Sequence, residues 1–184
     1  SNGFGTFTLG TNGAWTYSAD NTQTAFQSLG AGVTATDSFT AVSADGTSQV
    51  VTVTLTGIND GAVITGTTTG DVTEDGADPL TADGSLSITD ADTGDAVFAA
   101  QASSTRSNGL STFTLGTNGA WAYSEANTHT AIQSLGAGVT PTDSFTAVSA
   151  ACTGQVVTVT LTGTNDVTVV PGRTTVDVTD YCEA

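Results

Sequence analysis

The sequence contains no lysine or methionine, and it has only two arginines, one histidine, two cysteines and three prolines among 184 residues. Arg106 and Arg173 face 18 acidic residues, which leaves a formal net charge of −16. Such a chain lacks the cations that neutralise a row of phosphates, which excludes nucleic acid as a partner. It also has little attraction to anionic lipid. No apolar run approaches the roughly 20 residues that cross a bilayer, so we expect no membrane insertion.

Residues that could support catalysis are almost absent. His129, the single histidine, leaves no second imidazole for a histidine-based metal site, and any Ser/His/Asp triad would depend on it. Zinc and copper favour histidine and cysteine ligands, which are scarce here. A glycosidase needs two carboxylates facing each other in a cleft, whereas the acids of this chain cluster in predicted turns. We therefore predict that the protein is not an enzyme and that His129 lies on the surface of a short helix.

Alternating apolar residues and threonines dominate what is present. Only 11% of the residues are charged and 38% are hydrophobic. Gln155–Thr162 places Val157, Val159 and Leu161 on one face of a strand. Asn12-Gly13 and its copy Asn118-Gly119 are strong hairpin signals. In the later part of the chain we expect strands at Val63–Thr65, Asp71–Thr73, Ser85–Thr89, Ala96–Ala102, Thr112–Leu115, Trp121–Tyr123, Asp143–Ser149 and Gln155–Thr162, and a short helix near Ala126–Leu135.

The chain also repeats itself. The 56 residues that start at Gly5 return without a gap from Ser111, an offset of 106 residues, and 45 positions are identical. About seven short strands per 100 residues, joined by tight turns, are typical of an immunoglobulin-like β-sandwich. The period predicts such domains in tandem: an all-β fold of β-sandwich repeats of about 106 residues. Residues 1–60 are the back half of one repeat, residues 61–166 are a complete repeat, and residues 167–184 are the first strand of a following one. The absence of methionine predicts a processed product or a fragment.

Acidic residues gather where strands and repeats end. The turn Asp90–Asp95 offers oxygens at alternate positions and a glycine that permits a sharp bend, which suits a hard cation such as calcium. Two further acidic spots lie near the start of the complete repeat and at the repeat boundaries. The alternative is that these residues only cap turns and keep the surface soluble. The residues that we expect to bind calcium are Asn59, Asp60, Glu74, Asp75, Asp90, Asp92, Asp95, Asn165 and Asp166.

Several strings of the chain resemble the VCBS repeat of large bacterial RTX-type surface adhesins. They are GTFTLGTNGAWTY from Gly5, DSFTAVSADGT from Asp37 and VTVTLTGIND from Val51. VTED at Val72–Asp75 and TDADTGD at Thr89–Asp95 resemble the front half of that repeat. The resemblance covers essentially the whole chain. It implies extracellular, cadherin-like sandwiches in tandem on a Gram-negative cell surface, acting in cell adhesion or biofilm formation, with calcium stiffening the junctions.

The resemblance also implies partners and a grouping of the acids. The partners would be neighbouring repeats or identical subunits, with a cell-surface or carbohydrate target for the whole array. By analogy with cadherin-like junctions, two clusters would lie at opposite poles of the complete repeat. One would contain Asn59, Asp60, Asp90, Asp92 and Asp95, and the other Glu74, Asp75, Asn165 and Asp166.

Both cysteines replace turn glycines of the repeat. Cys152 stands where the first copy has Gly46, and Cys182 stands where the complete repeat has Gly76. In an oxidising compartment two cysteines most often form a disulfide, and two free thiols are the alternative. If the chain ran straight from Cys152 to the tail, the two residues would lie tens of ångströms apart, beyond disulfide reach. The tail therefore folds back, or Cys182 bonds a neighbouring chain, or no bond forms.

The phase of the repeat raises two further alternatives. Residues 1–60 lack the first strands of their repeat, which leaves a sheet edge unpaired, and residues 167–184 supply a spare first strand. A tail inserted into the next subunit would build a self-assembling filament, joined head to tail by strand exchange and a disulfide. In a different class, Trp15 or Trp121 would make the chain a carbohydrate-binding module. We expect both indoles to lie in a core instead, because both follow a hairpin turn within an alternating strand.

Overall fold

The structure is a computed structural model and describes residues 2–105 and 111–167. About half of these residues lie in β-strands, which are joined by turns and by two one-turn helices. The chain is therefore all-β, as the sequence predicts. Within the described ranges, neither helix is long and apolar enough to cross a lipid bilayer.

Residues 2–60 form two antiparallel hairpins that belong to separate two-stranded sheets. At the first hairpin turn, Gly13 has a φ of +83°, a conformation that glycine adopts without steric cost. The Gly10 N–H donates to the Ala14 carbonyl at 2.8 Å and closes this turn. The elements are β1 (Gly5–Leu9), β2 (Trp15–Ala19), α1 (Thr24–Gln27), β3 (Thr34–Val42) and β4 (Ser48–Thr56).

Residues 61–162 form a larger unit with two sheets. The five-stranded sheet has the order β5-β7-β10-β9-β8, and the three-stranded sheet has the order β11-β12-β6. Strand β6 runs parallel to β12, and all other pairs in the unit are antiparallel. The elements are β5 (Val63–Gly66), β6 (Thr69–Thr73), β7 (Leu80–Thr89), β8 (Gln101–Thr105), β9 (Thr112–Leu115), β10 (Ala120–Glu125), α2 (Thr130–Gln133), β11 (Thr142–Val148) and β12 (Gly154–Thr162).

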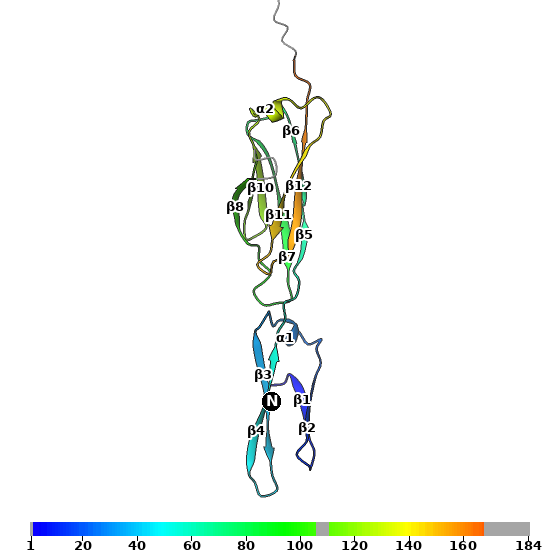
Figure 1. Ribbon diagram of the computed structural model, residues 1–184, viewed down its shortest axis with the longest axis vertical. Helices are drawn as coiled ribbons and strands as arrows, with labels where there is room; N and C mark the ends of the chain where they lie inside the picture. The colour runs from blue at the N-terminus through cyan, green and yellow to red at the C-terminus, as the bar shows by residue number, and fades with distance from the viewer. Residues whose placement is uncertain (1, 106–110, 168–184) are drawn as a thin grey trace, which may run out of the picture.

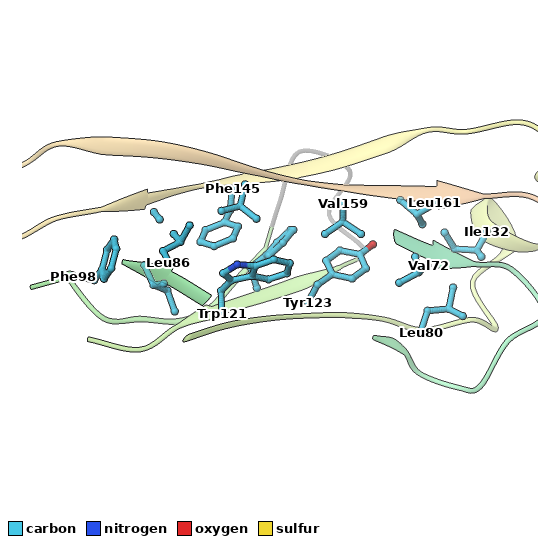
Figure 2. Close-up of a cluster of buried hydrophobic side chains, with 14 residues drawn as sticks. Val72, Leu80, Leu86, Phe98, Trp121, Tyr123, Ile132, Phe145, Val159 and Leu161 are labelled. Atoms are coloured by element: carbon cyan, nitrogen blue, oxygen red, sulfur yellow. The ribbon is translucent and has the colours of Figure 1, made fainter. Parts of the chain in front are cut away.

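One hydrophobic core fills the space between these two sheets (Figure 2). Phe113 and Trp121 come from the five-stranded sheet, and their rings lie 4.5 Å and 6.5 Å, centroid to centroid, from the ring of Phe145 in the other sheet. These are ordinary separations for aromatic pairs. The Trp121 indole N–H donates to the Thr67 carbonyl at 2.8 Å, so its polar group is satisfied. Val157, Val159 and Leu161 of β12 are buried in this core, which explains the alternating pattern of the strand.

The elements recur at the 106-residue offset of the sequence repeat. Helices α1 and α2 match residue for residue at this offset, and so do β4 and β12. Strands β1, β2 and β3 correspond to β9, β10 and β11, whereas nothing in residues 2–60 corresponds to β5–β8. Figure 1 shows the two parts end to end along the long axis of the molecule. The first part therefore has the back half of the unit without the strands that cover it.

Three predicted elements differ clearly in extent. Strand β7 (Leu80–Thr89) begins five residues before the strand expected at Ser85–Thr89. The strand expected at Ala96–Ala102 begins only at Gln101, since the Val97 N–H closes a turn onto the Asp95 carbonyl at 2.8 Å. Before β8, Phe98 makes an isolated bridge to Ser149. The helix expected near Ala126–Leu135 is a single turn in which only Ile132 is buried, too small an apolar face to extend it.

Candidate functional site

The acidic turn Asp90–Asp95 follows β7 directly and lies at the end of the complete unit that faces residues 2–60 (Figure 1). The Asp92 N–H donates to Asp90 Oδ1 at 3.0 Å, and the Asp95 N–H donates to the Asp92 carbonyl at 3.3 Å. Gly94 has a φ of +97°, which supplies the bend expected from the sequence. The turn is therefore closed by its own backbone and by the Asp90 carboxylate.

This turn is bonded to the first part of the chain. The Asp60 N–H donates to Asp92 Oδ2 at 2.7 Å, and the Thr93 N–H donates to the Ser28 carbonyl at 3.2 Å. A carboxylate that accepts a backbone N–H makes a charge-assisted bond, which is stronger than a neutral one. The acidic turn, the loop after α1 and the linker after β4 thus meet at one junction.

Two carboxylate oxygens of this junction have no hydrogen-bond partner among the described residues. Asp92 is only 2% exposed, and its Oδ1 atom is buried without a hydrogen bond among the described residues. The same holds for Oδ2 of Asp90. A Cβ atom on Gly30 would lie 3.7 Å from the Asp92 side chain, so the loop after α1 packs closely over it. Burying a charged oxygen without a hydrogen bond or a counterion costs free energy. Carboxylate oxygens are good ligands for a hard cation such as calcium.

The junction acids do not by themselves form a finished metal cage. In residues 2–105 and 111–167, no group of three or more His, Cys, Asp and Glu side chains is arranged to hold a metal ion. The side-chain N–H of Asn59 donates to the Asp60 carbonyl at 2.6 Å, so this amide makes a local backbone contact. The structure brings Asp60, Asp90, Asp92 and Asp95 to the junction, but it does not direct Asn59 toward their unpaired oxygens.

A second acidic site lies at the opposite end of the complete unit. Glu74 is 3% exposed, and its Oε2 atom accepts the Thr164 N–H at 2.9 Å. The Thr164 hydroxyl donates to Asp75 Oδ2 at 2.7 Å. Oε1 of Glu74 is buried and unpartnered among the described residues. Asn165 and Asp166 are exposed, and the Asn165 amide donates to the Asp166 carbonyl at 3.2 Å.

Thr164 was not among the residues expected from the sequence. Its signal was nevertheless present, since Thr164 is one of the few positions that differ between the copies: the first copy has Ile58 there. Ser28 and Gly30 were also missed, because they contribute through backbone atoms and close packing.

A buried acid inside the complete unit was missed as well. Glu125 is 1% exposed at the end of β10, and neither of its carboxylate oxygens has a hydrogen-bond partner among the described residues. Burial and the nearby Asp143 carboxylate raise the pKa of Glu125, and His129 acts in the opposite direction. Burial also raises the pKa of Tyr123, with further contributions from Glu125 and Asp143. The first copy has Ala19 in place of Glu125.

The two cysteines are only partly described. Cys152 is exposed and has a φ of +63°, the left-handed conformation that its counterpart Gly46 adopts with a φ of +87°. It forms no disulfide with a described residue. Cys182 lies outside the described residues. The predicted pairing therefore remains a prediction.

The two tryptophans have different environments although the strands around them are alike. Trp121 is 2% exposed, as predicted for a core residue, and is too buried to stack on a sugar. The same prediction is wrong for Trp15, which is 44% exposed. The reason is that the strands that cover Trp121 have no counterpart over Trp15.

The exposure of Trp15 is part of a wider apolar surface on residues 2–60. Leu9, Trp15 and Val51 line a groove beside the turns of the two hairpins. A second hollow lies at the other end of this part, between Phe26, Leu55 and Ile58. Ile58 is 78% exposed, which is unusual for an isoleucine. Residues 2–60 therefore expose apolar side chains at both of their ends.

The chain matches none of the protein-family models with which it was compared, and a search among curated proteins finds no match either.

Proposed function

We propose that this chain is a structural repeat module of an extracellular bacterial adhesin or fibre, in which calcium at the repeat junctions stiffens the array. It serves cell adhesion or biofilm formation by supplying length and rigidity, and it carries no catalytic site. The observation that carries the proposal is the junction between residues 2–60 and the complete unit, where Asp92 is buried with an unpaired oxygen.

A cation at the junction would act on a bond that already joins two repeats. Asp92 Oδ2 accepts the N–H of Asp60, which belongs to the linker, while Asp92 Oδ1 and Asp90 Oδ2 are buried and have no hydrogen-bond partner among the described residues. A calcium ion bound to these two oxygens, with Asp95 completing the carboxylate set, would neutralise the like charges of the acidic turn that faces the linker. A turn fixed by the cation would then keep its hydrogen bonds to Asp60 and Ser28 in place, and so stiffen the junction.

The composition and the repeat support the same function. With 18 acidic residues and only two arginines, most of the acids cannot have a side-chain counterion. The end-to-end placement of two sequence copies (Figure 1) is the arrangement that a stalk needs, because each added repeat lengthens it. The resemblance to VCBS repeats supplies the extracellular setting.

Thermal unfolding with calcium and with a chelator tests this proposal. A cation that binds only the folded state stabilises it by about 2.7 kcal/mol when its concentration is 100 times the dissociation constant. We expect calcium to raise the Tm of the chelator-treated chain, and Asp92→Asn to remove most of that rise. Magnesium should act more weakly, since it demands a stricter octahedral geometry.

Asp83→Asn is the matched control, because it removes the same charge from an exposed position of β7 in the same unit. The control should keep the calcium response of the unaltered chain. A Tm that is the same in calcium and in chelator would defeat the proposed calcium site, and so would an equal loss of the response in the two variants.

A further inference from the structure

Two buried carboxyl groups of the complete unit lie close enough for the charge of one to act on the other, yet they are bonded very differently. Asp143 of β11 is 2% exposed, and it accepts the Ser144 N–H at 2.8 Å and the Ser111 hydroxyl. Glu125 at the end of β10 is 1% exposed, and neither of its carboxylate oxygens accepts a hydrogen bond from a described residue.

This difference decides which of the two carboxyl groups keeps a proton. Hydrogen bonds from donors stabilise the charged form of a carboxyl group, whereas burial without donors favours its neutral form. When two carboxyl groups are close, the charge of one also opposes ionisation of the other. Burial and the charge of Asp143 accordingly raise the pKa of Glu125. The proton is therefore favoured on Glu125.

The other titratable groups around Glu125 come from several elements. Burial raises the pKa of Tyr123 on the same strand, so this phenol stays neutral near neutral pH. Asp78, in the loop before β7, accepts the N–H of Asn127 at 2.9 Å. His129 lies in the turn that leads into α2, is half-buried, and favours the charged form of Glu125. Among these groups, the imidazole is the one that can carry a positive charge.

The acid and the base differ together between the two sequence copies. Glu125 and His129 stand where the first copy has Ala19 and Gln23. The other buried acid is common to both copies, since its counterpart Asp37 is also fully buried. The common acid therefore belongs to the framework of the repeat, whereas Glu125 and His129 are an acid–base pair that the complete unit adds to it.

Glu125 lies where an outward movement disturbs little of the fold. It makes the last pair of the β10–β7 ladder, opposite Leu80. The chain then turns directly into α2, in which only Ile132 is buried. The hydrogen bond from Asn127 to Asp78 joins this turn to the rest of the unit at its surface. Strand ends and short surface elements of this kind open locally without global unfolding.

We propose that Glu125 is a proton-operated latch on residues 126–133, the segment that contains α2. With the proton bound, the carboxyl group stays in the core and the segment packs against the unit. Without the proton, the charged carboxylate turns outward toward His129 and the segment loosens, because a buried charge without donors is costly. Acid therefore closes this end of the complete unit, and a rising pH opens it. The latch needs no bound cation, so it is independent of the calcium proposal.

Carbon-13 NMR of the side-chain carboxyl groups tests the proton site in the full chain. The chain has three glutamates, so glutamate labelling gives three such signals, and the signal lost in Glu125→Gln belongs to Glu125. We expect its midpoint to lie above about pH 4.3, the value of an exposed glutamate. His129→Gln should raise the midpoint further, because it removes a charge that favours ionisation. A Glu125 midpoint at or below about 4.3 would overturn the proposal, and an unchanged midpoint in His129→Gln would refute the role of His129.

Amide hydrogen exchange of residues 130–133 tests the movement. The unaltered chain and Glu125→Gln are compared at each pH, so that the intrinsic pH dependence of exchange cancels. Between about pH 4.3 and the carboxyl midpoint, opening in the unaltered chain should grow by up to about tenfold per pH unit relative to the variant, and then level off. Asp83→Asn is the matched control: it removes an exposed carboxylate of β7 and should exchange like the unaltered chain. Equal exchange in the unaltered chain and Glu125→Gln at every pH would overturn the latch.

Discussion

The two copies of the repeat form the same hairpins but have very different interiors. Leu115 is 3% exposed and Trp121 is 2% exposed, whereas their counterparts Leu9 and Trp15 are 45% and 44% exposed. The strand pairings agree: Trp121 stands opposite Leu115 in one hairpin and Trp15 stands opposite Leu9 in the other. Local pairing is therefore set by the hairpin sequence itself, while burial depends on strands β5–β8, which only the complete unit has.

The largest expected difference between the copies concerns the tryptophans. Trp121→Ala removes a fully buried ring and the hydrogen bond to Thr67, and should lower the free energy of unfolding of the complete unit by about 3–5 kcal/mol. Trp15→Ala should cost less than about 1 kcal/mol in the monomer, because its ring is half in solvent. Urea denaturation followed by circular dichroism measures both. Equal losses would show that residues 2–60 have a core of their own.

The turn glycines sharpen the comparison. Gly13 and Gly119 both have a φ of +83°, but only at Gly119 would a Cβ atom collide, at 2.1 Å from the Leu86 carbonyl oxygen. Nothing lies within 4 Å of the same atom at Gly13. Gly13→Ala should therefore cost only the backbone strain of a left-handed residue, about 1–2 kcal/mol. Gly119→Ala should cost a further 1–3 kcal/mol or so of overpacking.

Urea denaturation again measures the difference. Gly116→Ala is the control, because it adds a methyl group to the same turn without left-handed backbone strain. Gly116 lies in the same turn as Gly119 with an ordinary negative φ, and the nearest atom to its added Cβ would be the Asn118 side chain. If Gly13→Ala and Gly119→Ala were equally destabilising, the packing of β7 against the second turn would contribute nothing.

The sequence predicts those parts of the fold that depend on local pattern. Asn118-Gly119 marks a hairpin because few other dipeptides adopt its backbone angles, and the period of two in Gln155–Thr162 identifies its buried face. The exposure of Trp15 was not predictable from its strand, since it is caused by elements that residues 2–60 lack. The one signal for this exposure is the 106-residue offset, because it aligns residues 5–60 with only the second half of the complete repeat.

The candidate site divides in the same way. The carboxylates of Asp90 and Asp92 are recognisable from the turn sequence, but their unpaired oxygens arise from how the loop after α1 packs over them. The contact between Thr164 and Glu74 joins residues 90 positions apart, so no local pattern reveals it. Glu125 alternates with Tyr123 and Trp121 on the buried face of β10, and this period was the available signal that it is buried.

The smallest expected difference is the pH dependence that Glu125 gives to the complete unit and that Ala19 cannot give to the first part. Burial raises the pKa of Glu125 in the folded state, while the unfolded chain has the ordinary value of about 4.3. The folded state then binds the proton more tightly. Its contribution to stability is complete below the unfolded pKa and is lost as the pH rises through the folded pKa.

Glu125→Gln mimics the protonated form, so the variant and the unaltered chain should unfold at similar Tm values at low pH. The variant should become the more stable of the two as the pH rises toward neutrality. A Tm series from pH 4 to 8 measures this divergence, and Ala19→Glu, which adds the acid where no sheet covers it, should produce a much weaker one. A constant Tm difference across the series would mean that Glu125 is charged in the folded unit and is compensated by His129 rather than held neutral by burial.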